Sequence, residues 1–520
     1  MASLTLYPED ERLTGRNRAA LNLYLVSALA LFVLMMLIGL AMRSTQAGWL
    51  DVPPAMFYKL LSMHGAGMVG TMVMASTAVM WFFLRKYVTL HLWAFVTNYA
   101  LFLLGALCII GAIFGGGYAA LWTFLYPLPT HGVGMWGSNA SALFMLGYLL
   151  IGVGELIFYL DAAAGIIKVY GNLGRAMGWQ WLFGGKVDPD HPKTVVAGTS
   201  MIIANSLGIL AGAVVLVMSL INIFYPQVAL DALFTKTLIY WFGHMYINAA
   251  IYMGVIAIYE LLSRYTGKPY PLSRVFLWGW AATTVFVITV FPHHLLMDYA
   301  EPHWFLMMGQ IVSWTSGFPV VVVTAWGAFT NLYRANMRWS MPPRLLLLSL
   351  FGWIAGGFGA VLDSTISINR VMHNTQWVPG HFHFYLLLGV LAMLLAFMYH
   401  LIGARTRAPA NSAADRVGFP VYVGGALIFL LAFLDAGHLS VPRRMAEHLS
   451  AWTYTDKLGT VGATLVVLAM IFFAIRITVA LLKPPRLSPV PETVPEPLPE
   501  PAPSPPLGDP GVVGSANTAG

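Results

Sequence analysis

Residues 373–383 read His-Asn-Thr-Gln-Trp-Val-Pro-Gly-His-Phe-His and lead into a long apolar run. The stretch predicts a helix that begins with two histidines separated by one residue. On an α-helix, residues i and i+2 point about 200° apart, so His381 and His383 face nearly opposite sides of one helix. Such a helix can hold two metal centres, one against each face, if the rest of the chain supplies partners.

The composition is that of a membrane protein. Of the 520 residues, 58% are hydrophobic and 9% are charged, whereas soluble domains carry roughly 25% charged residues. Runs of about 20 apolar residues cross a bilayer, and we expect an all-α integral membrane protein with about twelve transmembrane helices. The expected spans are 20–42, 55–84, 92–115, 140–166, 196–224, 233–262, 274–297, 303–330, 345–369, 380–402, 417–437 and 458–482.

Charge and proline content predict how the chain is divided and oriented. We expect a cytoplasmic N-terminal segment at 1–19, a twelve-helix membrane domain at 20–482 and a Pro-rich, disordered cytoplasmic tail at 483–520. Lys and Arg are concentrated in the loops on the side of the N-terminus, which predicts that both termini are cytoplasmic. The net charge of +7 is therefore assigned to these loops and not to nucleic-acid binding. The longest of them, at about 167–195, is expected to include an interfacial helix. The single cysteine, Cys108, excludes a cysteine-based metal site or a covalent haem attachment in this chain.

Six histidines share one depth in the expected helices. Counting 1.5 Å per residue from the helix ends places all of them in the outer half of the membrane. Ionisable residues inside a bilayer are costly and usually functional, and unrelated core histidines would have no reason to lie at one level. The six are His64, His244, His293, His294, His381 and His383.

These histidines divide into three sites. His64 and His383 are expected to hold a six-coordinate, low-spin haem between them. His381 is expected to be the only axial ligand of a second, high-spin haem with an open face. The remaining three, namely His244, His293 and His294, are expected to hold a redox metal opposite that face, since imidazole suits Cu and Fe.

This pattern resembles subunit I of the heme–copper oxidase superfamily, which includes cytochrome c oxidases and nitric oxide reductases. The motifs that carry the resemblance are Trp-Phe-Gly-His ending at His244, a His-His pair with Asp298 four residues on, and residues 373–383. The His-Asn-Thr version of the last motif is most similar to the B-type branch. The resemblance covers nearly the whole chain apart from the tail.

The resemblance implies further roles and cofactors. His373 and Asp298 would lie near the propionates of the active-site haem, and Arg443 and Arg444 would pair with propionates, although an ordinary charge pair is the alternative for the two arginines. The low-spin haem is expected to be b-type, and the type of the high-spin haem is left open. Because no carboxylate ligand stands beside the three histidines, copper is favoured over iron.

The sixth expected span departs from the oxidase pattern. In A- and B-type oxidases a redox-active tyrosine follows the sixth-span histidine by four residues, but this position is Asn248, and Tyr246 points elsewhere. Similar nitric oxide reductases have a glutamate there. Reduction of two NO to N2O needs two electrons and no tyrosine, so we expect an NO reductase related to the B-type branch, in which Asn248 offers its carbonyl oxygen or amide to NO. The alternatives are a cytochrome c oxidase, with Tyr240 as a substitute tyrosine, and, more distantly, a twelve-helix secondary transporter.

Protons and electrons must both reach such a site. Glu155, Glu260, Thr315 and Asp363 are candidates for a proton path, with helix–helix hydrogen bonding as the alternative role of each. An electron-donating subunit with an outer-facing dinuclear copper or cytochrome c domain is expected to dock near Arg443. The expected location is a bacterial or archaeal cytoplasmic membrane.

Overall fold

The computed structural model describes residues 13–122, 124–337, 339–406 and 410–483. Within these ranges the chain forms 12 helical segments that are long and apolar enough to cross a membrane, which confirms the predicted fold class. The α-helices in chain order are α1 (Gly15–Gln46), α2 (Pro54–Leu84), α3 (Leu92–Ile110), α4 (Ser138–Tyr170), α5 (Leu173–Ala176), α6 (Lys193–Phe224), α7 (Ala232–Thr266), α8 (Arg274–Thr289), α9 (His303–Val321), α10 (Gly327–Leu332), α11 (Met341–Asp363), α12 (Ile366–Met372), α13 (Trp377–His383), α14 (Leu391–Thr406), α15 (Ala413–His438) and α16 (Thr453–Leu482).

The observed helices overlap every predicted span and are mostly longer. The first begins at Gly15 instead of 20, because helical structure continues beyond the apolar stretch that hydropathy detects. The ninth ends at Asp363 instead of 369, and the residues after it form the separate helix α12. In the 167–195 loop, where an interfacial helix is expected, the structure has the single turn α5 and a short 3-10 turn. Residues 1–12 and the predicted tail from 484 onward lie outside the described residues.

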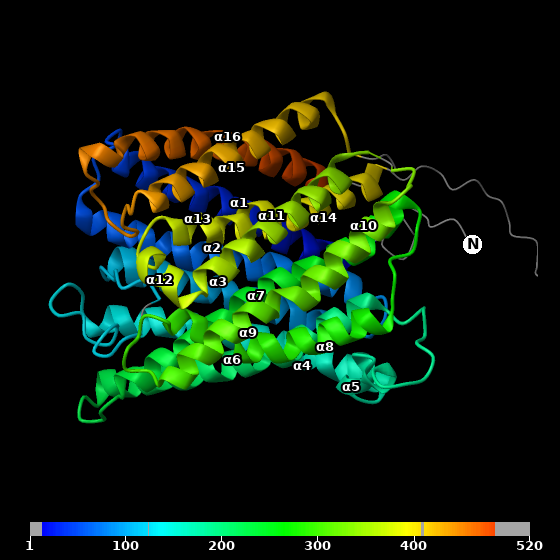
Figure 1. The fold of residues 1–520 in the computed structure, drawn as a ribbon, viewed down its shortest axis with the longest axis horizontal. Helices are drawn as coiled ribbons and strands as arrows, with labels where there is room; N and C mark the ends of the chain where they lie inside the picture. Colours follow the sequence, from blue (N-terminus) through cyan, green and yellow to red (C-terminus); the bar gives the residue numbers. More distant parts are fainter. Residues whose placement is uncertain (1–12, 123, 338, 407–409, 484–520) are drawn as a thin grey trace, which may run out of the picture. The chain divides into compact units, whose positions relative to one another are not determined.

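Three spans are largely enclosed by the others: α2, α7 and the tenth span, which joins α13 through the π-helical segment Phe384–Val390 to α14. Figure 1 shows α2 and α7 between the layer of α15 and α16 on one side and that of α4 and α6 on the other. These three enclosed spans carry four of the six histidines, so the sequence buries its candidate ligands within the bundle.

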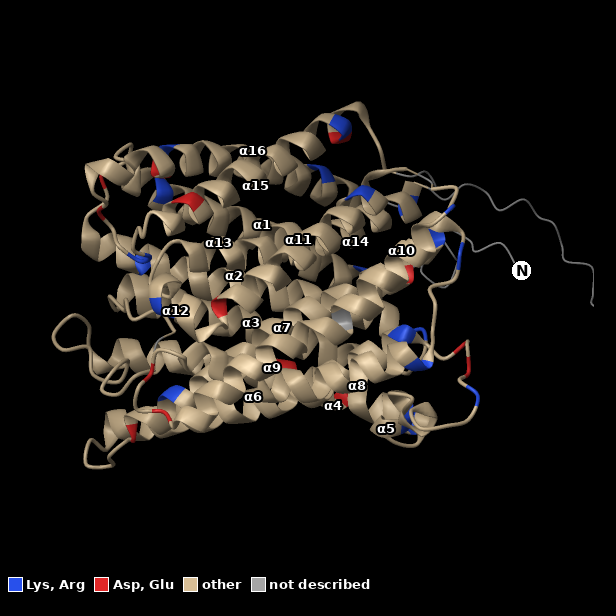
Figure 2. Cartoon of the chain, viewed as in Figure 1, with Lys and Arg blue, Asp and Glu red and all other residues tan. Residues whose placement is uncertain are grey.

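Lys and Arg residues gather at the two ends of the bundle, and only a few acidic residues lie along the middle of the helices (Figure 2). Few residues that would have to leave water therefore lie along the lengths of the helices. This distribution is the one expected of a protein whose helices cross the hydrocarbon core of a bilayer.

Candidate metal and cofactor site

One cavity of about 520 Å³ lies between the enclosed helices, and all six predicted histidines line it. Apolar side chains of α1, α4, α15 and α16 form much of the remaining wall. The cavity is thus a largely apolar space into which six imidazoles project, which is the character of a site for a large, flat, apolar cofactor.

His64 and His383 lie on opposite sides of one part of this cavity. Their ring centroids are 6.4 Å apart and their planes differ by 19°. The Nδ1 of His64 hydrogen-bonds with the carbonyl oxygen of Met35 at 2.8 Å, and that of His383 with the carbonyl oxygen of Pro379 at 2.7 Å. Because each Nδ1–H donates to a carbonyl, each ring keeps Nε2 free for a metal. A histidine nitrogen binds a metal at about 2 Å, so two rings that share one ion have centroids roughly 6 Å apart.

His381 leaves α13 on the other side. A Cβ atom at Gly359 of α11 would come within 2.5 Å of its Nδ1, and its Nε2 lies 3.8 Å from Asp363 Oδ2. The His383 ring instead packs on Phe433 of α15, with centroids 5.5 Å apart. The two histidines of the motif therefore face α11 and α15, as their spacing predicts.

His244, His293 and His294 form the three-histidine cluster, in which one ligand nitrogen from each lies within 4.8 Å of the others. His244 comes from α7, and the other two come from the 3-10 turn that follows α8. The Nδ1 of His244 is 3.2 Å from the Nε2 of His294. The Nδ1 of His293 hydrogen-bonds with the Ser313 hydroxyl at 2.6 Å, which leaves its Nε2 free. Three converging imidazole nitrogens form a donor set for copper or iron.

The side chain of Asn248 lies against His244. Its Nδ2 donates to the His244 carbonyl oxygen at 2.8 Å and lies 3.0 Å from the His244 Nε2. The hydroxyl of Tyr246 is buried without a hydrogen-bond partner among the described residues. Tyr240, one turn before His244, packs on His294 with ring centroids 5.8 Å apart. The position four residues after His244 thus holds an amide, and this amide contacts the His244 ring.

The sequence of the chain matches a known protein family. A profile of the family described as cytochrome c and quinol oxidase polypeptide I matches residues 19–475. The chain belongs to this family. The match runs from α1 into α16 and therefore includes every helix that contributes to the cavity, and it confirms the resemblance to heme–copper oxidase subunit I.

Relatives within the family are distant. The chain is 26% identical to cytochrome c oxidase subunit 1 of Thermus thermophilus, over 56% of this chain and 55% of the relative. It is 25% identical to heme-copper oxidase subunit I+III of Aeropyrum pernix, over 70% and 44%, and 24% identical to cytochrome c oxidase polypeptide 1 of Halobacterium salinarum, over 84% and 73%. The matches to the first two relatives span about half of those relatives' lengths.

A solved structure shares the fold of the oxidase polypeptide I family. A cryo-EM structure of a heme-copper terminal oxidase dimer superposes with a TM-score of 0.70 at 17% identity, over 91% of this chain and 85% of that chain. The similarity supports the twelve-helix arrangement.

Oxidase polypeptide I family membership implies two haems and a copper centre, and the residues present fit that set. The cavity offers one pair of opposed imidazoles, one further imidazole on the other side of α13, and the three-histidine cluster. Each of the three sites that we predicted from sequence thus has a counterpart in the arrangement of side chains.

The loop after α15 reaches the 373–383 stretch. Thr375 and Pro442 form an antiparallel bridge, which places Arg443 Nη2 3.4 Å from His373 Nε2. Burial, together with the positive charges of Arg443 and Arg444, lowers the pKa of His373 to about 4. These three residues line the cavity. Asp298 is placed differently: its carboxylate pairs with Lys236 of α7, and it is not among the residues that line the cavity.

The four candidates for a proton path lie in different surroundings. Glu155 is fully buried in α4, with its carboxylate 3.2 Å from the Thr77 hydroxyl. Glu260 lies near the C-terminal end of α7. Its carboxylate accepts hydrogen bonds from the hydroxyl groups of Tyr87 at 2.8 Å and Thr194 at 2.5 Å. Asp363 lines the cavity. Thr315 is exposed, and its hydroxyl bonds to carbonyl groups of its own helix.

Two glycines lie against the rings of candidate ligands, and the sequence alone did not identify them. A Cβ atom at Gly39 of α1 would lie 2.8 Å from Cε1 of His64, just as one at Gly359 would meet His381. The available signal was glycine within apolar helices, which marks close approach of another group. That signal could not indicate which side chain approaches.

Proposed function

We propose that this chain is the catalytic subunit of a respiratory membrane reductase that converts two NO to N2O. Residues 20–482 would be the catalytic domain. His64 and His383 would hold a low-spin, b-type haem, His381 a high-spin haem, and the three-histidine cluster a copper ion, with iron as the alternative. Family membership supports the set as a whole, and the directions of the imidazoles in the cavity support its division.

The observation that carries the choice of NO is Asn248. An amide cannot donate an electron, and here its nitrogen is committed to the backbone and ring of His244. The reaction 2 NO + 2 e⁻ + 2 H⁺ → N2O + H2O needs only two electrons. A haem held by His381 and a metal held by the three-histidine cluster would supply these two electrons when bound, so a redox-active side chain is not required.

The chain's own residues position these groups and handle charge. Asn248 holds the His244 ring with Nδ1 directed at the cluster, so we assign it a positioning role and not direct contact with NO. Arg443 and Arg444 supply positive charge at the wall of the cavity, where carboxylate groups of a haem would be neutralised. Asp363 offers a carboxyl group at the same wall that can hold a proton near His381.

Electrons would come from a partner. Family membership is consistent with a second subunit, and we propose an electron-donating subunit with a dinuclear copper or cytochrome c domain that docks near Arg443. We further propose that both termini are cytoplasmic, that the cavity lies in the outer half of a bacterial or archaeal cytoplasmic membrane, and that protons pass through Glu155 or Glu260.

Turnover with each gas tests the choice of substrate. The purified holoprotein, supplied with a small-molecule electron donor, is expected to release one N2O for every two NO consumed and to reduce O2 much more slowly. Rapid reduction of O2 to water with little N2O would contradict the proposal and favour an oxidase.

A matched pair of variants tests Asn248. Asn248→Ala removes the amide that fixes His244, so NO turnover is expected to fall about tenfold, which corresponds to one lost hydrogen bond of about 1.4 kcal/mol, with both haems retained. Tyr246→Phe deletes a hydroxyl that has no partner among the described residues and is expected to keep turnover. Equal activity of the two variants would remove the role assigned to Asn248.

One observation favours oxygen reduction as a second candidate. Tyr240 packs on His294, a member of the three-histidine cluster, with ring planes 26° apart. A phenol in this position could supply the extra electron that O2 cleavage needs. Under this alternative Tyr240→Phe would abolish O2 reduction, whereas under the NO proposal it leaves N2O formation largely intact.

A further inference from the structure

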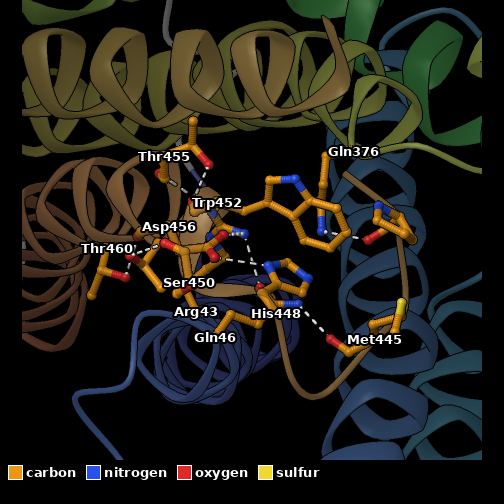
Figure 3. Close-up of polar contacts among 12 residues, drawn as sticks. Arg43, Gln46, Gln376, Met445, His448, Ser450, Trp452, Thr455, Asp456 and Thr460 are labelled. Atoms are coloured by element: carbon orange, nitrogen blue, oxygen red, sulfur yellow. Dashed lines mark hydrogen bonds and ion pairs between the residues drawn. The ribbon is translucent and has the colours of Figure 1, made fainter. Parts of the chain in front are cut away.

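A buried charged cluster lies where α1, α16 and the loop between α15 and α16 meet (Figure 3). Asp456 Oδ1 is 3.1 Å from Arg43 Nη1, and Asp456 Oδ2 is 2.8 Å from His448 Nδ1. Gln46 accepts a hydrogen bond from Arg43 at 2.8 Å and donates one to the Met445 carbonyl at 2.8 Å. The carboxylate therefore bridges a guanidinium and an imidazole.

The charged cluster is almost completely shielded from solvent. Arg43 is 4% exposed and Asp456 is fully buried, and the His448 side chain is also fully buried. The arginine and the aspartate neutralise each other, as buried ions must. With its Nδ1–H donated to Asp456, His448 retains an Nε2 atom that has no partner among the described residues. The cluster thus has one open position for a proton.

The cluster borders the proposed low-spin haem site. Arg43 itself lines the cavity, and its guanidinium carbon lies 4.7 Å from the centre of the Phe433 ring. Phe433 also packs on the ring of His383, with centroids 5.5 Å apart and ring planes 19° apart. One residue therefore separates the ligand from the charged cluster. Charges separated by so little apolar material interact strongly, because the effective dielectric constant there is far below that of water.

We propose that His448, held by Asp456 and Arg43, binds a proton when the adjacent low-spin haem accepts an electron. The added negative charge on the haem favours an imidazolium at His448, which Asp456 then pairs with. By linkage, a proton on His448 makes the haem easier to reduce to the same extent. The electron comes from the donor and the proton from water beside the α15–α16 loop, and both leave again on oxidation. The inference rests on the proposed assignment of His64 and His383.

The charged groups near His448 come from α16, α1, its own loop and α15. Asp456 faces it from α16 and Arg43 from α1. In its own loop, Glu447 is exposed and Arg443 contacts His373. From α15, the carboxylate near the end that joins this loop is Asp435, which accepts a hydrogen bond from Tyr454.

Redox titration of the low-spin haem in the holoprotein tests the proposal. In the wild type the midpoint potential is expected to fall as pH rises, by up to about 59 mV per pH unit. His448→Gln retains a donor for Asp456 but cannot take up the proton, so the slope is expected to disappear. His438→Gln, which changes an exposed histidine at the same end of the bundle, is the matched control and keeps it. An unchanged slope in His448→Gln would overturn the proposal.

A second variant keeps the test decisive if His448→Gln does not accumulate. Asp456→Asn removes the partner of the imidazolium, so the pH interval over which the potential changes is expected to move to lower pH. A wild-type interval in that variant would also overturn the proposal. Failure of the haem assignment gives a different result, because the low-spin spectrum would then survive replacement of His383.

Discussion

A hydrogen bond to one ring nitrogen of a histidine decides whether the other nitrogen is left to bind a metal. Backbone carbonyl oxygens take the Nδ1–H of His64 and of His383, whereas Ser313 occupies the Nδ1 of His293. At His244 the Nδ1 lies towards His294 of the cluster, and the Nε2 lies 3.0 Å from Asn248 Nδ2. A metal bound at Nδ1 requires the proton on Nε2, and the amide nitrogen, itself a donor, does not accept that proton. At His64 and His383 the carbonyl acceptors therefore fix the tautomer that leaves Nε2 for a metal.

Replacement of His383 by Ala is expected to remove the low-spin haem and leave the other one. The opposed imidazole of His64 then has no partner across the cavity, and a six-coordinate site cannot form. The absorption spectrum of the reduced protein and its haem content measure the loss, with His303→Ala, an exposed histidine at the start of α9, as control. A retained low-spin band would show that His383 is not the ligand.

The stability of the protein is expected to decrease as the pH is lowered, because of His373. Burial and the nearby arginines lower its pKa to about 4, whereas an unfolded histidine titrates near 6.5. Between these values the unfolded chain binds a proton that the folded chain excludes, so stability decreases as pH falls from about 6.5 towards 4. The melting temperature in detergent measures this, and His373→Gln is expected to flatten the decrease. An identical pH dependence in the variant would exclude His373 as a cause.

At the scale of elements, α13 and α11 pack closely against each other. The tenth span contains a π-helical segment directly after His383, and π-helical turns are often found at functional sites. Opposite it, α11 presents Gly359 to the ring of His381. The helix pair can approach this closely only because the position on α11 has no side chain.

Gly359→Ala is expected to disturb the high-spin haem site. The added methyl group would lie 2.5 Å from His381 Nδ1, and such overpacking costs about 1–3 kcal/mol. Carbon monoxide binding to the reduced protein reports a haem with an open face and is expected to decrease several-fold. Gly357→Ala, where the nearest atom is 3.5 Å away, should bind carbon monoxide normally. If both variants bind it equally, His381 does not depend on that contact.

For the whole molecule, much of the architecture could be predicted from the chain alone. Apolar run length located every span, since the bilayer imposes a minimum length on all of them, and a shared depth grouped the histidines. Two features could not be predicted. The bridge between Thr375 and Pro442 joins segments far apart in sequence, and the packing of Tyr240 on His294 depends on how α7 meets the turn after α8.

The most direct test of the account is the haem and metal content of the purified chain. Six histidines around one cavity predict two haems and one further metal ion per chain, with one haem low-spin and the other able to bind carbon monoxide when reduced. A protein that is folded and pure but contains no haem, or only one, would contradict the assignment of the cavity.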